Sequence, residues 1–156
     1  MPRRRVVVLA VAAVLAAGVL GSGWWLVRRD SRVDPSTVAL PSPSGEPTEV
    51  RAYFAGDGAP LVAFLEATSD LPATSTPEQC QALAAELTGI GEPPDLMGLA
   101  VWVPDPGVRD VAVQHTTAVG RYLDECGAGR PLESAADRAH FSATVLRRLL
   151  ERDGVL

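Results

Sequence analysis

Residues 104–129 decide the fold, and they read PDPGVRDVAVQHTTAVGRYLDECGAG. Apolar side chains recur in this stretch every three or four residues, which is the spacing of one face of an α-helix. Asp105 can cap the first turn, and Gly127 with Gly129 ends the run. The sequence therefore predicts a helix with its apolar stripe at Val108, Val111, His115, Ala118, Tyr122 and Cys126.

Helical patterns also lie on both sides of this stretch. An apolar run interrupted at residues 56–58 predicts a short turn of helix and then a helix over about 59–70, or one bent helix. Thr76 and Gln79 can form a capping box around Pro77, which predicts a helix that ends near Gly89. Ser134 is expected to cap a last helix, whose apolar face is Phe141, Val145, Leu146, Leu149 and Leu150.

Residues 93–103, PPDLMGLAVWV, fit either a short helix or a strand. No second strand candidate lies nearby to pair with this segment, so we favour the helix. Four principal helices with short connections then predict an all-α fold, a small antiparallel helical bundle over residues 50–156.

Cys80 and Cys126 are the two cysteines of the chain, and each lies on the apolar stripe of a different predicted helix. Cys80 is near the start of its helix and Cys126 is at the end of the other, and antiparallel neighbours bring such ends together. The long helix exceeds the shorter one by about 13 Å, a gap that an ordered helix within 93–103 would fill. We therefore predict one disulfide, which also favours an oxidising compartment.

The N-terminal region has the pattern of a membrane anchor. Residues 6–27, VVVLAVAAVLAAGVLGSGWWLV, carry no charge and reach about 33 Å as a helix. They predict a transmembrane helix after a cytoplasmic n-region at 1–5, or else a signal peptide whose removal releases a secreted chain. The side chains expected at the membrane interfaces are Arg3, Arg4, Arg5, Trp24, Trp25, Arg28 and Arg29.

Residues 28–49 are rich in proline and serine, and they predict a semi-rigid stalk between this anchor and the bundle. A long chain that follows an early hydrophobic segment is usually exported. The predicted topology is a single pass through the cell membrane, with the N-terminus cytoplasmic and residues 50–156 extracytoplasmic.

The net charge of −5 is the sum of two opposite parts. Residues 1–32 hold six Arg and one acid, a balance of +5, whereas residues 33–156 hold eight Arg and eighteen acids, a balance of −10. A body this acidic argues against nucleic acid and anionic lipid as close partners.

No motif of a known catalytic, metal or cofactor site occurs, and the sequence predicts none of these groups. His115 is expected to be a hydrogen-bonded histidine of the core or of its boundary. His140 follows Asp137 by three residues, which alone is a weak metal signal. Trp102 is expected in the core or as a lid over one end of the bundle, with a partner-facing position as the alternative. The four residues retained as candidate partner or pocket contacts are Trp102, Tyr122, His115 and His140.

This layout of an anchor, a Pro-rich stalk and a two-cysteine helical domain resembles small single-pass envelope proteins of high-GC Gram-positive bacteria. The resemblance covers the whole chain but carries no motif that transfers a function. The leading hypothesis is a non-enzymatic extracytoplasmic module that contacts other envelope proteins. The alternatives are a small-ligand or sensory module with a pocket near Trp102 and Tyr122, and an enzyme built around His115 or His140.

Overall fold

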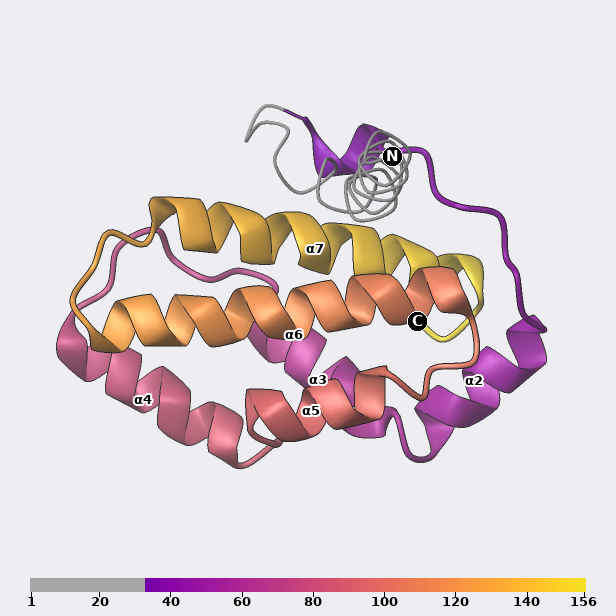
Figure 1. Ribbon diagram of the computed structural model, residues 1–156, viewed down its shortest axis with the longest axis horizontal. Helices are drawn as coiled ribbons and strands as arrows, with labels where there is room; N and C mark the ends of the chain where they lie inside the picture. The colour runs from indigo at the N-terminus through magenta and orange to yellow at the C-terminus, as the bar shows by residue number, and fades with distance from the viewer. Residues whose placement is uncertain (1–32) are drawn as a thin grey trace, which may run out of the picture. The chain divides into compact units, whose positions relative to one another are not determined.

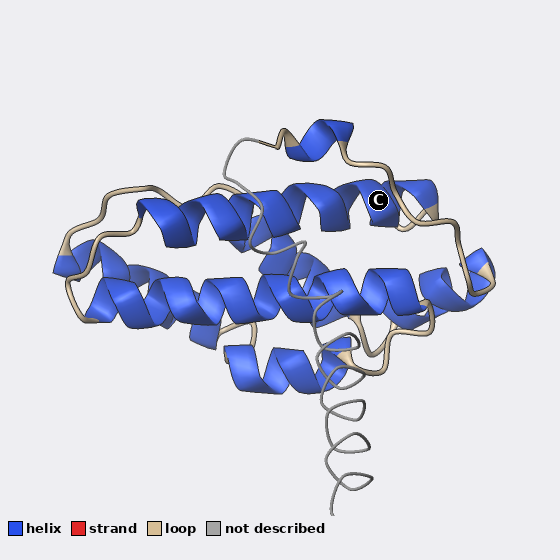
Figure 2. Ribbon diagram, turned by 45° about the horizontal axis from the view of Figure 1, so that its top comes forward, coloured by secondary structure: helices blue, strands red, loops and turns tan. Residues whose placement is uncertain are grey.

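The computed structural model describes residues 33–156, which contain six α-helices and no strand (Figure 2). A short 3-10 helix, η1 (Pro35–Thr37), comes first. The α-helices are α2 (Pro47–Ala55), α3 (Ala59–Thr68), α4 (Pro77–Thr88), α5 (Pro93–Ala100), α6 (Pro106–Gly127) and α7 (Glu133–Arg152). The prediction of an all-α helical bundle is confirmed for this part of the chain.

The predicted n-region at 1–5 and the membrane segment at 6–27 lie outside the described residues, together with their flanking Arg and Trp side chains. Among residues 33–156, no helix combines the length and the apolar character that crossing a membrane requires.

Helix α6 lies in the middle of the bundle (Figure 1). The chain reverses direction between α6 and α7, so these two long helices run antiparallel along their length, while α5 and α4 pack against another side of α6 and α3 reaches both α6 and α7. Because α6 has neighbours on several sides, its buried set differs from the predicted stripe, of which Val111 and Ala118 are only partly buried. It comprises Val108, Ala112, His115, Thr116, Val119, Tyr122 and Cys126.

Local sequence signals start most of these helices. A proline occupies the first or second position of α2 to α6, where its missing N–H costs no helical hydrogen bond. The capping box of Thr76 and Gln79 is confirmed. The predicted cap at Ser134 is wrong, because α7 begins one residue earlier, after the buried side chain of Leu132. The hydroxyl of Ser134 instead accepts a hydrogen bond from Arg138.

The ambiguous segment 93–103 is helical at Pro93–Ala100. With this helix included, α4 and α5 together are nearly as long as α6. Helices α4 and α5 have 12 and 8 residues, about 30 Å together, against about 33 Å for the 22 residues of α6. The start of α4 thereby reaches the end of α6. Cys80 and Cys126 form the predicted disulfide there, with their Cα atoms 5.7 Å apart.

Residues 34–46, which we call the strap, lie along the bundle. The Nη1 atom of Arg148 donates to the carbonyl oxygens of Pro35 and Val38, at 2.8 Å each. Arg152 donates from Nη1 to the carbonyl oxygen of Pro41 at 2.6 Å. The strap therefore belongs to the same compact unit as the helices, which spans Asp34–Leu156.

Asp105 holds the far end of the strap and caps α6 at the same time. Its Oδ1 accepts from the N–H of Val108 at 2.9 Å, as the capping prediction requires. Its Oδ2 accepts from the N–H groups of Ser44 and Gly45, at 2.8 and 3.2 Å. Burial alone would raise the pKa of Asp105, but these three N–H donors hold it below its ordinary value.

The structure differs here from the stalk predicted over residues 28–49. Of the predicted stalk, Pro35–Thr37 form η1 and residues from Pro47 onward belong to α2, so the part between them lacks helical structure. Carbonyl groups of such a segment are left to accept from other parts of the chain, as those of Val38 and Pro41 do from Arg148 and Arg152. The pattern of prolines carries no signal for arginines more than a hundred residues away.

Breaking the disulfide is expected to lower the free energy of unfolding. The bridge joins residues 46 positions apart, for which the chain-entropy model gives at most about 4 kcal/mol. Urea denaturation of the chain with and without reductant measures the loss, which we expect to be about 2–4 kcal/mol. Ellman titration of denatured, unreduced chain should find no free thiol, and a titre of two thiols would contradict the bridge.

Replacing Arg148 with Ala is expected to release the strap without unfolding the bundle. The variant loses two hydrogen bonds from a charged donor, worth about 1–2 kcal/mol in the free energy of unfolding. Hydrogen exchange at the Ser36 and Thr37 amides, which lie between the two carbonyl groups that Arg148 holds, should become about tenfold faster. Arg147→Ala is the matched control, and equal exchange in the two variants would show that Arg148 does not hold the strap.

Candidate functional site

The most exposed large apolar side chain that the structure describes is Trp102, at the corner between α5 and α6. It is 76% exposed, and its neighbour Val101 is 47% exposed. The expectation of Trp102 in the core or as a lid is wrong. Ala100 and Val103, three residues apart, fill the inner side of this turn, so the two residues between them face solvent.

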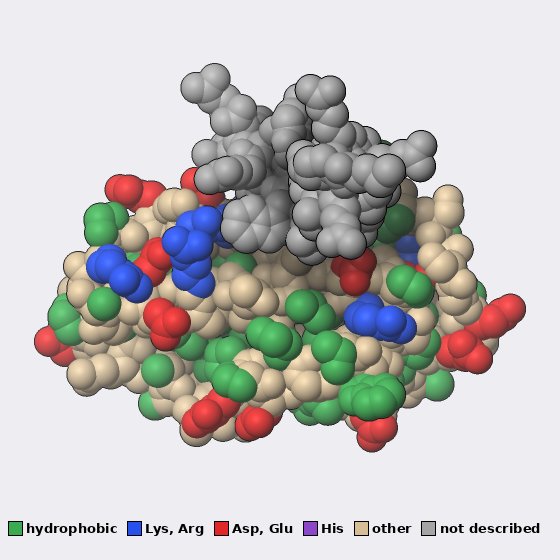
Figure 3. Space-filling view, viewed as in Figure 1, with side chains coloured by type: hydrophobic (Ala, Val, Ile, Leu, Met, Phe, Trp, Pro, Cys, Tyr) green, Lys and Arg blue, Asp and Glu red, His purple; other side chains and the backbone are tan. Residues whose placement is uncertain are grey.

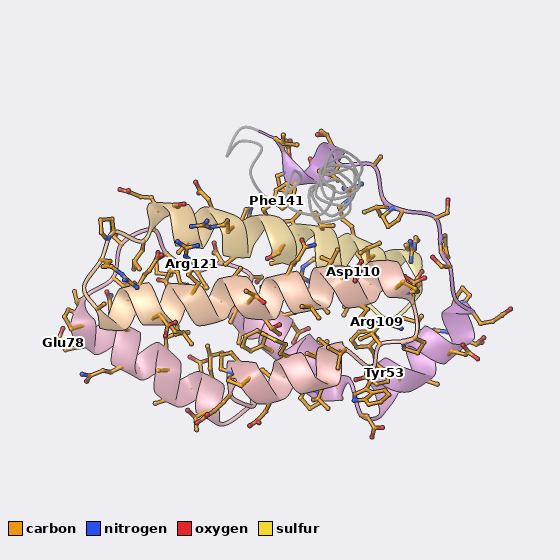
Figure 4. All side chains as sticks on the ribbon, in the orientation of Figure 1. Tyr53, Glu78, Arg109, Asp110, Arg121 and Phe141 are labelled. Carbon is orange, nitrogen blue, oxygen red and sulfur yellow. A yellow bond between two sulfur atoms is a disulfide. The ribbon has the colours of Figure 1, made fainter. Side chains whose placement is uncertain are left out.

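Hydrogen bonds from other helices hold this corner in place. The carbonyl oxygen of Leu99 accepts from the N–H of Trp102 at 3.0 Å and from the hydroxyl of Tyr53 in α2 at 2.6 Å. Arg109 in α6 donates from Nε to the carbonyl oxygen of Val103 at 2.9 Å and from Nη2 to that of Pro104 at 3.3 Å. Tyr53 and Arg109 lie beside the corner in Figure 4.

Tyr53 is itself fixed by the turn between α2 and α3. Its ring lies against Gly58, where an added Cβ would collide with it, and it packs edge-on against Phe54 with ring centroids 5.4 Å apart. Burial raises the pKa of Tyr53, and the nearby Asp57 carboxylate raises it further. The phenol therefore stays protonated and keeps donating to Leu99. We call Tyr53, Leu99, Val101 and Trp102 the Trp102 surface.

Sequence reasoning did not single out Tyr53, Leu99 and Val101 as parts of this surface. It also did not predict the hydrogen bonds from Arg109 that support it. The signal for Val101 and Trp102 was present in the spacing of Ala100 and Val103, which matches the inner face of a helical turn. No local signal relates Tyr53 or Arg109 to the corner, because their partners are backbone carbonyls that only the packing brings near.

His115 is a core histidine, as predicted. It is 1% exposed, and its Nε2 and Nδ1 atoms lie 2.8 Å from Thr68 Oγ1 in α3 and 3.1 Å from Ser142 Oγ in α7. A hydroxyl can donate or accept, so these two neighbours satisfy either tautomer of the neutral ring. Removal from water lowers the pKa of His115 to about 4, against a weaker opposing effect of the Ala139 carbonyl.

Tyr122 and His140, the other candidate contact residues, do not lie at the Trp102 corner. Tyr122 is buried near the far end of α6, where its hydroxyl donates to the carbonyl oxygen of Pro72 at 2.9 Å and lies 3.2 Å from Ser75 Oγ. About 24 Å of helix separates it from the corner at Trp102. His140 is exposed on α7, with Nδ1 3.3 Å from the Ser69 carbonyl oxygen. Within residues 33–156, no three His, Cys, Asp or Glu side chains gather where they could hold a metal ion.

An open groove of about 190 Å³ lies between α4, the start of α5 and α6. Its lining residues are Ala84, Leu87, Thr88, Glu92, Pro93 and Leu123. It contains neither Trp102 nor Tyr122, so it is not the pocket that the ligand-binding hypothesis places near them. It is also smaller than the roughly 300 Å³ typical of small-molecule sites.

No protein-family model, curated protein or solved structure matches the chain.

The buried His115 is expected to make the domain less stable as the pH falls from about 6.5 to about 4. In this range the unfolded chain binds a proton that the folded chain does not, so folding loses up to about 3 kcal/mol. Urea denaturation at pH 6.5 and pH 5 measures the slope. The His115→Gln variant should lose this pH dependence of the free energy of unfolding, and the exposed control His140→Gln should keep it. Identical slopes in the two variants would show that the pH dependence does not come from His115.

Proposed function

We propose that the chain is a membrane-anchored, non-enzymatic extracytoplasmic module that contacts another envelope protein through the Trp102 surface. The observation that carries the proposal is Trp102 itself, 76% exposed on a corner that hydrogen bonds from α2 and α6 hold in place. Tryptophan is enriched among the residues that dominate binding energy at protein interfaces.

The rigidity of the corner supports a binding role. An exposed tryptophan on a mobile loop would lose conformational freedom when a partner bound it, and that loss would reduce affinity. The hydrogen bonds from Tyr53 and Arg109 already fix the backbone of this corner in the free protein, so little conformational freedom is left to lose on binding. The buried part of the turn, Ala100 and Val103, ties the exposed part to the core.

The anchoring part of the proposal is supported by the uncharged segment 6–27 and by the disulfide, a bond typical of exported domains. The strap changes the expected reach of the anchored domain. With residues 34–46 held on the bundle, the tether after a span ending at residue 27 is residues 28–33. Six residues extend to about 20 Å at most, so the proposed site of action is close to the membrane surface.

A photo-crosslinking amino acid at position 102 of the full chain, in its native membrane, is expected to capture a discrete protein partner. The same amino acid at Asp137, exposed on α7, is the control and should capture at least tenfold less of it. Trp102→Ala should reduce co-purification of that partner by a similar factor.

The circular dichroism and melting temperature of Trp102→Ala should stay near those of the parent chain, because the replaced side chain is exposed. Equal crosslinking from positions 102 and 137, or no protein adduct from position 102, would contradict the proposed contact.

A further inference from the structure

The charge of the bundle is divided unequally between its two halves. Residues 46–106, which form α2 to α5, hold ten acids and one arginine, a balance of −9. Residues 107–156, which form α6 and α7, hold seven acids and seven arginines. Nearly all the negative charge therefore lies in the segment 46–106, whose helices and connecting loops include the Trp102 surface.

The single arginine of the acidic half is hydrogen-bonded to the C-terminal segment. Arg51 donates from Nη1 to the carbonyl oxygen of Asp153 at 3.0 Å, next to the C-terminus. In Figure 3 the arginine side chains lie over α6 and α7, while acidic and hydrophobic side chains share the margin formed by α4, α5 and the α2–α3 turn.

Three carboxylates border the Trp102 surface. Glu49 and Tyr53 are four residues apart in α2, and Asp95 and Leu99 are four residues apart in α5, so each pair shares a helix face. Asp57 lies close enough to raise the pKa of Tyr53. The sequence of α2, α3 and α5 thus places an acidic border around an apolar centre.

Arg109 is a basic side chain at the corner, and two of its nitrogen atoms already donate to backbone carbonyls. Its Nε and Nη2 atoms donate to the carbonyl oxygens of Val103 and Pro104. Its charge offsets one of the three carboxylates, and the border stays negative.

We propose that the Trp102 surface binds a basic segment of the partner protein, one that presents an apolar side chain to Trp102 and arginine or lysine to Glu49, Asp57 and Asp95. This inference rests on the proposed function and names the chemistry of the partner. Complementary charges around an apolar contact raise the association rate and reject partners of the wrong sign.

The same charges disfavour the other occupants. Anionic lipid would meet three carboxylates, which repel it. A second copy placed with the same surface would bring two acidic borders together, because a twofold contact opposes identical patches. An uncharged apolar segment would leave the carboxylates without partners.

The test uses the full chain in phosphatidylcholine nanodiscs and a fluorescent helical peptide of arginine and leucine that lacks tryptophan. Binding is followed by fluorescence anisotropy at about 0.05 M and about 0.3 M salt. We expect the higher salt to weaken binding about tenfold. A peptide with serine in place of leucine should bind about tenfold more weakly, and one with glutamate in place of arginine should not bind.

Two sets of variants locate the binding. Trp102→Ala, and Asp57→Asn combined with Asp95→Asn, should each weaken binding about tenfold, and the double variant should lose most of the salt dependence. The matched control is Glu78→Gln combined with Asp137→Asn, which changes the net charge equally away from the corner. Glu78 lies at the opposite end of the bundle from Tyr53 in Figure 4.

Equal weakening by the control pair would overturn the inference, since binding would then follow net charge alone. Tight binding of the glutamate peptide, dimerisation of the chain through Trp102 in analytical ultracentrifugation, or binding of the disulfide-bonded domain to phosphatidylglycerol vesicles would also overturn it. If crosslinks from position 102 capture a protein but the peptide series shows no preference, the proposed function stands and the inference about charge fails. If no crosslink forms, the proposed function itself fails.

Discussion

The burial of helix α6 on several sides is the constraint on which the rest of the structure depends. Helix α7 covers one side, α5 and α4 cover another, and α3 reaches it as well. A polar side chain buried in α6 needs a hydrogen-bond partner inside the protein. The imidazole of His115 has two, the hydroxyl groups of Thr68 and Ser142. Both ends of α6 are also fastened, at the start by Asp105 and at the end by the bond from Cys126 to Cys80.

Asp105 connects the start of α6 to the strap with the two oxygens of one carboxylate. Oδ1 caps the helix, and Oδ2 holds the backbone of Ser44 and Gly45. Arg152 forms a bidentate pair with Asp153 and donates to Pro41 as well, so the strap, the start of α6 and the end of α7 meet in one polar region. The compact domain thus begins near residue 34.

The candidate contact surface is a consequence of this packing. Helix α5 must follow α4 to match the length of α6, and the chain must then turn to enter α6. The turn buries Ala100 and Val103 and leaves Val101 and Trp102 outside. The acidic composition of α2 to α5 surrounds that apolar corner, which is why charge and exposure together favour a basic partner segment.

Helical periodicity, the capping residues Thr76 and Asp105, and the positions of the two cysteines were enough to predict the all-α bundle and its disulfide, because these signals are local or follow from helix length. They also predicted a buried, hydrogen-bonded His115. The spacing of Ala100 and Val103 held a signal that Trp102 is exposed, but tertiary structure alone decided that Tyr53 and Arg109 brace its corner and that residues 34–46 lie along the bundle. Those outcomes depend on contacts between side chains and backbone carbonyls that only the packing brings together, and such carbonyls leave no pattern of side chains for the sequence to display.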